Sequence, residues 1–129
     1  MGSLTKQILI IEDEPNLRTL VQVCLEVMGK WKVIVANSGY EGLLLAEREK
    51  PDAILLDCMM PQMDGITFLQ ELLANPEIQT IPVIFLTAKT DLIEPEQYLP
   101  LGARGAIAKP FEPLLLHKQV AAFLGWDFQ

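Results

Sequence analysis

Apolar residues along the chain alternate between short compact runs and longer stretches with helical spacing. Five short runs, rich in β-branched residues, occupy residues 7–11, 32–35, 53–56, 83–86 and 105–108. Between these runs, apolar side chains recur every three or four positions, which favours amphipathic helices. Strict alternation of strands and helices is typical of a parallel sheet with helices on both faces. The pattern therefore predicts an α/β protein with five strands.

Residues that favour helix starts and stops divide the first half of the chain. Pro15 lies where proline favours the first turn of a helix, and Gly29 ends the apolar pattern that follows. Ser38 and Glu41 have the spacing of a capping box for a second helix, which should end before Pro51. Two helices therefore separate the first three strands.

The second half of the chain contains a helical segment that prolines should disturb. A helix is expected at about residues 65–74, after a turn-rich loop. The stretch 91–101 contains Pro95 and Pro100, so any helix there should be short or irregular. A closing helix is expected over residues 113–124.

Length, charge and cysteine content limit the classes of protein. The chain has 129 residues, half of them apolar, and residues 1–129 should form one domain. Residues 1–5 are expected to be disordered or foreign to the natural protein. A net charge of −7 disfavours binding to nucleic acid or anionic membranes, and no apolar run approaches the roughly 20 residues that span a bilayer. Cys24 and Cys58 lack metal-ligand spacing and are expected to be buried thiols, which suits a cytoplasmic protein.

Polar side chains follow four of the predicted strands at the point where each strand ends. Glu12 and Asp13 follow the first strand, Asp57 the third, Thr87 the fourth and Lys109 the fifth. In an open parallel sheet of the flavodoxin-like order, these strand ends meet in one crevice. Clustered carboxylates repel one another unless a cation neutralises them, and their hard oxygens suit Mg²⁺. Such a metal site, with a hydroxyl and an ammonium beside it, fits phosphoryl transfer to a carboxylate.

Four segments resemble, in order and spacing, the signature regions of the receiver domains of two-component response regulators. They are ILIIEDEPNLR, DAILLDCMMPQMDG, LTA and GARGAIAKPF, and the resemblance extends over nearly the whole chain. It implies a CheY-like, doubly wound sheet with the strand order 2-1-3-4-5 and a signalling switch controlled by phosphorylation. It also implies a histidine kinase or phosphotransfer protein as phosphodonor and a downstream protein as effector. The sequence leaves a homodimer open.

The same resemblance assigns a role to each candidate site residue. Asp57 would accept the phosphoryl group, and the chain would catalyse its own phosphorylation and dephosphorylation without being a turnover enzyme. Further groups would hold Mg²⁺, contact the phosphoryl oxygens or shape the loops around them. The implied metal ligands are Glu12, Asp13, Asp57 and the backbone carbonyl of Met59. The implied phosphoryl contacts are Thr87, the backbone N–H of Ala88, and Lys109. Gly65 would allow a close approach of the chain at the start of the third helix, and the peptide bond before Pro110 would be cis.

Two positions depart from the family pattern. The first acidic position is usually aspartate, and the longer Glu12 is expected to reach the metal through water. Ala106 stands where many receivers have tyrosine or phenylalanine. Switching through an aromatic side chain at that position is therefore not expected, and we expect the loop of residues 88–100 to respond instead.

Each site residue has a structural explanation when taken alone. Glu12 and Asp13 would suit a helix cap, and Asp57 would suit a turn. Thr87 would simply end a strand, and Lys109 would be a solvated charge. Their coincidence at four strand ends favours the functional interpretation.

Methionine and histidine residues offer further candidates, which we expect to be structural. Met59, Met60 and Met63 follow Asp57 closely, but packing in loop and core explains them better than a soft-metal site. His117, in the closing helix, is expected to be structural or solvent-facing and not a phosphohistidine.

Three other functions are alternatives. A flavodoxin-like FMN-binding module would share the fold, but it needs a hydroxyl-rich and amide-rich loop where this chain has acidic residues. A haloacid-dehalogenase-type phosphatase needs an aspartate two residues after its nucleophile, where this chain has Met59. A degenerate receiver, acting as a constitutive protein-binding module, is disfavoured by the presence of Asp57, Thr87 and Lys109.

Overall fold

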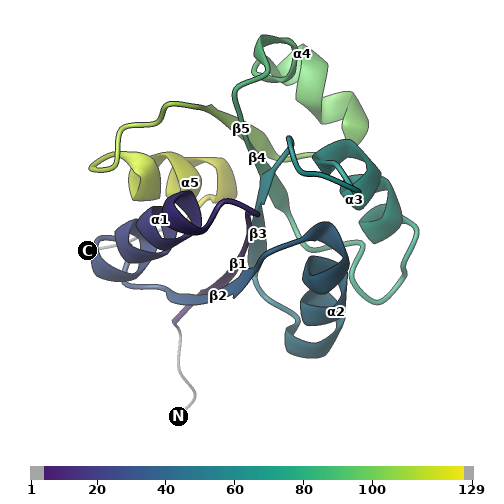
Figure 1. The fold of residues 1–129 in the computed structure, drawn as a ribbon, viewed down its shortest axis with the longest axis horizontal. Helices are drawn as coiled ribbons and strands as arrows, with labels where there is room; N and C mark the ends of the chain where they lie inside the picture. Colours follow the sequence, from purple (N-terminus) through teal and green to yellow (C-terminus); the bar gives the residue numbers. More distant parts are fainter. Residues whose placement is uncertain (1–4, 127–129) are drawn as a thin grey trace.

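The strands form one five-stranded parallel sheet. The computed structural model of the chain describes residues 5–126, so the expectation for the first four residues lies outside it. The sheet order is β2-β1-β3-β4-β5, which confirms the predicted fold class (Figure 1). The strands are β1 (Gln7–Ile11), β2 (Lys32–Ala36), β3 (Ala53–Asp57), β4 (Val83–Thr87) and β5 (Gly105–Ala108).

Burial explains why the central strands have almost continuously apolar sequences. All five residues of β3 and all five of β4 are buried, because helices cover both faces of the sheet. The edge strand β2 is more open, with only Ala36 fully buried. The two most buried strands are also the ones that end in Asp57 and Thr87.

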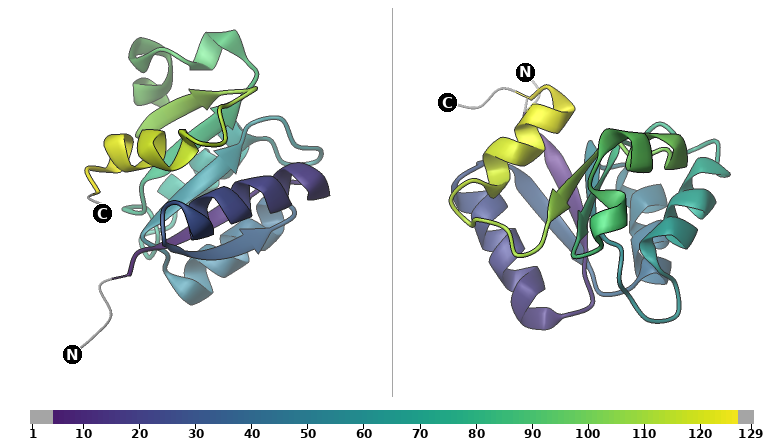
Figure 2. Two further views of the ribbon diagram at one scale, coloured as in Figure 1. Left: turned by 90° about the vertical axis from the view of Figure 1, so that its left-hand side faces the viewer. Right: turned by 90° about the horizontal axis from the view of Figure 1, so that it is seen from above.

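Helices cover the two faces of the sheet in separate layers (Figure 2). One layer packs against Ile8 and Ile10 of β1, and the other packs against Leu9 and Ile11, as expected for alternating strand side chains. The first layer consists of α1 (Pro15–Val27) and α5 (Leu116–Leu124); the second consists of α2 (Gly39–Glu49), α3 (Gly65–Leu73) and α4 (Pro95–Tyr98). None of the helices described within residues 5–126 is long and apolar enough to cross a membrane.

Ser38 and Glu41, the residues predicted to cap the start of α2, both form hydrogen bonds there. The Ser38 hydroxyl accepts a hydrogen bond from the backbone N–H of Glu41 at 3.1 Å. In return, the Glu41 carboxylate accepts from the backbone N–H of Asn37, one residue ahead of the cap, at 2.7 Å. Both contacts pair N–H groups that lack partners at a helix start.

The start of α5 differs from the prediction. The helix begins at Leu116, three residues after the expected start at Pro113. The intervening residues form a turn in which the Leu115 N–H donates to the Glu112 carbonyl at 2.9 Å. Proline permits a helix to begin but does not require it, and here the backbone of Leu115 (φ −112°, ψ −10°) departs from helical geometry.

The proline-containing segment after β4 is irregular, as predicted. It consists of a 3₁₀ turn η1 (Thr90–Leu92), the single turn of α4 and a second 3₁₀ turn η2 (Leu99–Leu101). Pro95 is the first residue of α4, and Pro100 lies inside η2.

Candidate functional site

The pairing register places the acidic residues of two strands opposite each other. Ile11 of β1 pairs with Leu56 of β3, so Glu12 and Asp57, each the next residue along, lie side by side. The strand order reverses between β1 and β3, since the chain runs from β1 outward to β2 and then returns to β3. A crevice at such a reversal is the usual ligand position in open α/β sheets. Asp13, the next residue after Glu12, has a carboxylate oxygen close to those of Glu12 and Asp57.

The remaining strands bring a hydroxyl and an amine to the same edge. Asp57 pairs with Leu86 of β4, so Thr87 lies one residue beyond it. Thr87 pairs in turn with Ala108 of β5, and Lys109 follows directly. Four strands thus bring Glu12, Asp13, Asp57, Thr87 and Lys109, the side chains predicted to follow strand ends, to one end of the sheet.

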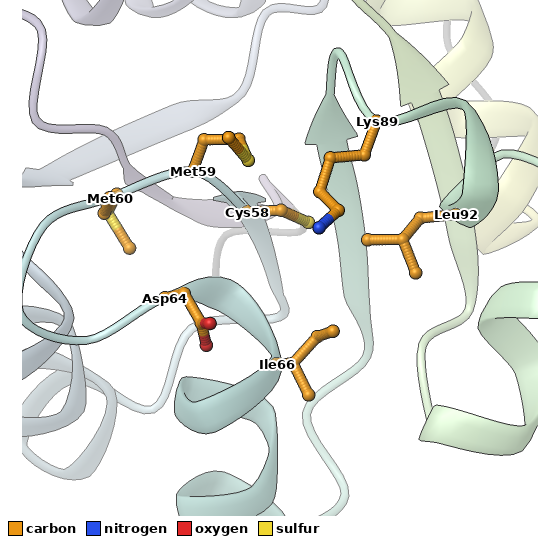
Figure 3. A pocket seen from close by; sticks show the side chains of 7 residues that line it. All are labelled: Cys58, Met59, Met60, Asp64, Ile66, Lys89 and Leu92. Atoms are coloured by element: carbon orange, nitrogen blue, oxygen red, sulfur yellow. The ribbon is translucent and has the colours of Figure 1, made fainter.

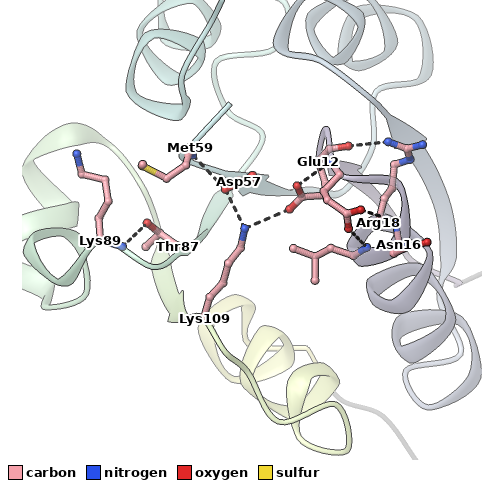
Figure 4. Close-up of polar contacts among 10 residues, drawn as sticks. Glu12, Asn16, Arg18, Asp57, Met59, Thr87, Lys89 and Lys109 are labelled. Atoms are coloured by element: carbon pink, nitrogen blue, oxygen red, sulfur yellow. Dashed lines mark hydrogen bonds and ion pairs between the residues drawn. The ribbon is translucent and has the colours of Figure 1, made fainter. Parts of the chain in front are cut away.

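Three carboxylates and one ammonium group form the centre of the site. Figure 4 shows Glu12, Asp57 and Lys109 of this group. Glu12, Asp13 and Asp57 each offer an oxygen atom, and these oxygens all lie within 4.8 Å of one another. The Lys109 Nζ lies 3.1 Å from Asp57 Oδ1 and 3.3 Å from Glu12 Oε1. Glu12 and Asp57 are almost fully buried, at 2% and 3% exposure, so water screens their repulsion poorly. The donor set is hard, anionic and close enough together for one divalent cation.

Burial changes the acidity of Glu12. Its pKa rises from the ordinary value of 4.5 to about 7, chiefly because burial disfavours the charged form. The charge and the hydrogen bond of Asp57 raise it further, whereas the Glu14 N–H and the Lys109 ammonium act in the opposite direction. The Glu14 N–H donates to Glu12 Oε2 at 3.1 Å.

Backbone groups fix the loop that follows Asp57. The Met59 N–H donates to Asp57 Oδ1 at 3.0 Å. The Gly65 N–H, at the start of α3, donates to the Cys58 carbonyl at 3.1 Å. A Cβ atom at residue 65 would lie 2.7 Å from the Cys58 Cα, so only glycine allows this approach. The loop that follows Asp57 is therefore held against the start of α3.

The Thr87 hydroxyl is engaged by its own loop. The side chain is fully buried, and its Oγ1 accepts a hydrogen bond from the Lys89 N–H at 2.9 Å (Figure 4). Ala88, between them, is exposed. The Lys109–Pro110 peptide bond is cis.

Residues 8–121 match the protein family described as response regulator receiver domain. The chain belongs to this family. Receiver domains are signalling modules of two-component systems rather than turnover enzymes, and histidine kinases are their partners. The match spans the whole sheet except Gln7, the first residue of β1, and all but the end of α5.

Relatives and solved structures support the same assignment. The Bacillus subtilis protein named alkaline phosphatase synthesis transcriptional regulatory protein PhoP is 40% identical over 121 residues, which are 94% of this chain and 49% of the relative. Response regulator Rre1 of Synechocystis is 37% identical over 106 residues, which are 82% of this chain and 46% of that protein. The chain thus spans about half the length of the curated relatives it matches.

Two solved structures show how closely the fold agrees. Chemotaxis response regulator CheY4 of Vibrio cholerae has a TM-score of 0.82 at 28% identity, covering 92% of this chain and 98% of that one. The receiver domain of sensor histidine kinase PA1611 from Pseudomonas aeruginosa has a TM-score of 0.80 at 31% identity, covering 94% of this chain and 98% of that one. The PA1611 structure has a magnesium ion coordinated in its active site cleft.

A pocket of about 440 Å³ opens beside the site in this receiver domain, between the loop after β3 and the loop after β4 (Figure 3). The amine of Lys89 points into it from one side (Figure 3). Sequence reasoning did not anticipate this pocket, because neither loop has a regular pattern. Its lining residues are Cys58, Met59, Met60, Asp64, Ile66, Lys89 and Leu92.

The residues expected to be structural divide between core and surface. Met60 and Met63 are buried in the core, whereas Met59 is 59% exposed. His117 is buried in α5, and burial followed by the charge of Lys118 lowers its pKa. Packing therefore accounts for these residues except Met59.

Both cysteines are buried, as predicted. Burial raises the pKa of the Cys58 thiol to about 12, despite a hydrogen bond with Thr87. Because the thiolate is the reactive form, the raised pKa and the burial of Cys58 favour a structural role for this thiol, although it follows Asp57 directly.

Two contacts were missed from the sequence. Glu14, rather than Glu12 or Asp13, caps α1, since its carboxylate accepts from the N–H groups of Asn16 and Leu17. The Arg18 guanidinium donates to the Glu12 carbonyl at 2.9 Å. Arg18 ends the first signature segment, but the sequence pattern alone gives it no role.

Proposed function

We propose that this receiver domain is a phosphorylation-dependent switch that accepts a phosphoryl group on Asp57 with the help of Mg²⁺. One observation carries the proposal: three carboxylates have oxygens within 4.8 Å of one another, and the Lys109 amine lies 3.1 Å from one of them, Asp57 Oδ1. An acidic cluster that needs a cation, beside a carboxylate nucleophile, is the arrangement that aspartyl phosphorylation requires. The magnesium ion in the PA1611 receiver structure supports the choice of metal.

The residues present fit a magnesium ion. Asp13 and Asp57 would bind it directly, together with the backbone carbonyl of Met59, because Mg²⁺ prefers a few oxygen ligands and retained water. Glu12 would act through water, since its Oε2 already accepts from the Glu14 N–H and its Oε1 from Lys109. When bound, the metal would neutralise charge on the transferred phosphoryl group.

The phosphoryl group would come from a histidine kinase or a phosphotransfer protein. An oxygen of Asp57 attacks phosphorus, the new oxygen–phosphorus bond forms, and the donor's nitrogen–phosphorus bond breaks with its electron pair staying on nitrogen. The Lys109 ammonium pairs with the phosphoryl oxygens, and the Thr87 hydroxyl and the Ala88 N–H donate hydrogen bonds to them. In dephosphorylation, water attacks the same phosphorus and the bond to Asp57 breaks, releasing phosphate.

The signal would leave the site through the loop after β4. In the structure the Thr87 hydroxyl accepts from the Lys89 N–H, so turning toward a phosphoryl oxygen removes that contact. The segment that follows is held by short turns rather than by a long helix. Ala106 is buried and has no ring that could change position. We therefore propose that phosphorylation shifts a conformational equilibrium of residues 88–101, which a downstream protein reads by contact.

Labelling with a small phosphodonor tests the phosphoacceptor. Asp57→Asn should abolish hydroxylamine-labile labelling, because an amide lacks the nucleophilic oxygen. Asp91→Asn, which changes an exposed carboxylate on the same end of the sheet, is the matched control and should label like the natural protein. Undiminished labelling of Asp57→Asn would contradict the assignment, and a natural protein that no phosphodonor labels would favour a degenerate receiver.

A further inference from the structure

We propose that Arg18 is a positioning residue for the metal site, which it reaches through the backbone of Glu12. The inference rests on the proposed function, because it assumes that the acidic cluster binds Mg²⁺. Arg18 lies in α1 and touches none of the candidate metal-ligand atoms in the contacts described. Its effect would come from holding the turn that carries Asp13.

The backbone of Glu12 is the group through which Arg18 would act. The Glu12 N–H donates to the Ala36 carbonyl at 3.1 Å, which continues the pairing of β1 with β2. After Glu12 the chain turns away from the sheet into α1, so the strand ladder does not supply a partner for its carbonyl. The guanidinium of Arg18 donates to this carbonyl at 2.9 Å (Figure 4). A polar group in so buried a residue needs such a partner.

Arg18 holds the residues on both sides of Asp13. Its backbone N–H donates to the Glu14 carbonyl at 2.9 Å, while its side chain binds the Glu12 carbonyl. Glu14 is itself tied to Glu12, because its N–H donates to Glu12 Oε2. Asp13 therefore projects from a three-residue turn whose two ends are fixed to the same helix residue. The planar guanidinium suits this role, since its donors have a fixed geometry.

Simple electrostatics predicts the opposite effect of removing Arg18. A cation near the acidic cluster opposes the binding of a second cation, so its loss should strengthen Mg²⁺ binding. Positioning predicts weaker binding, because outer-shell partners of ligand residues are commonly needed for full metal affinity. The sign of the change therefore separates the two roles.

Direct Mg²⁺ titration by calorimetry tests the inference with two neutral variants. Arg18→Met keeps the aliphatic stem, and Arg18→Gln keeps a polar end too short to reach the Glu12 carbonyl. Either variant that folds, judged by circular dichroism, should bind Mg²⁺ roughly tenfold more weakly. Arg48→Met, which removes the same charge from an exposed position on α2, is the control and should bind like the natural protein or more tightly.

Phosphorylation supplies a second measurement. The Arg18 variants should need roughly tenfold more Mg²⁺ for half-maximal labelling but should reach the natural maximal rate, since they keep Asp57, Thr87 and Lys109. Equal or tighter Mg²⁺ binding by the variants, or a lower maximal rate with unchanged Mg²⁺ affinity, would overturn the inference. Absence of Mg²⁺ binding by the natural protein would instead refute the proposed function.

Discussion

Replacing Glu12 with glutamine should stabilise the domain against unfolding at neutral pH when divalent cations are chelated. Burial, with a further contribution from Asp57, raises the pKa of Glu12 from 4.5 to about 7. Because the folded pKa lies above the unfolded one, the folded state binds the proton more tightly. The stability that this proton contributes is fully present below about pH 4.5 and is lost as the pH rises through about 7. Glutamine removes that loss because its side chain stays neutral.

The expected gain follows from the change in proton affinity. Each tenfold change in proton affinity corresponds to about 1.4 kcal/mol, so the rise of the pKa from 4.5 to about 7 sets an upper limit of roughly 3–4 kcal/mol. The glutamine carbonyl can still accept from the Glu14 N–H, but the ion pair with Lys109 at 3.3 Å is lost. The pKa of about 7 already includes the attraction of Lys109, so the loss of this ion pair is not a further cost. We expect Glu12→Gln to be more stable by about 1–3 kcal/mol at about pH 8 and by much less at about pH 5.

Urea unfolding in the presence of EDTA measures this difference. Trp31 and Trp126 pack edge to face, with ring centroids 5.1 Å apart, so their fluorescence should report loss of the fold. Glu71→Gln removes an exposed carboxylate on α3 and is the matched control, for which no pH-dependent gain is expected. A stability change in Glu12→Gln that is the same at both pH values, or a net loss at about pH 8, would refute the reasoning.

Three other predictions concern the metal, the loop after Asp57 and the output. Asp13→Ala should weaken Mg²⁺ binding more than Glu12→Gln does, because Asp13 is the proposed direct ligand; equal losses in a calorimetric titration would contradict this ranking. Gly65→Ala should lower the free energy of unfolding by about 1–3 kcal/mol, because its Cβ would meet the Cys58 backbone at 2.7 Å; an unchanged urea midpoint would show that the loop can yield. Beryllium fluoride, a phosphoryl mimic, should increase amide protection mainly in residues 88–101; a dominant change in β5 and α5 would refute the proposed output.

The fold could be predicted because its signals are local. The unbroken apolar runs of β3 and β4 reflect strands buried on both faces, and their regular alternation with helical patterns allows few topologies. The candidate site followed from one further step, since strand ends in such a sheet share an edge. Glu12, Asp57 and Lys109 were therefore grouped correctly although 97 residues separate the first from the last.

Details that depend on competing contacts could not be predicted. Pro113 is compatible with a helix start, but the turn before Leu115 satisfies the local backbone instead, and α5 begins later. Three consecutive acidic residues precede α1, and nothing in their order shows that Glu14 is the cap while Glu12 turns inward. The contact of Arg18 with Glu12 likewise depends on how α1 leaves the sheet.

The acidic cluster has opposite effects on the stability of the metal-free domain and on the proposed binding of Mg²⁺. Glu12 is held in a buried site where its charge is disfavoured, which weakens the domain at neutral pH when no divalent cation is bound. The same concentration of negative charge is what would attract Mg²⁺, so binding should restore stability by an amount that grows with the logarithm of the free metal concentration above its Kd. Glu12→Gln should therefore begin more stable than the natural domain but gain less from added Mg²⁺. The two stability curves should converge as Mg²⁺ is raised, because a substitution that relieves repulsion also removes part of the attraction for the metal.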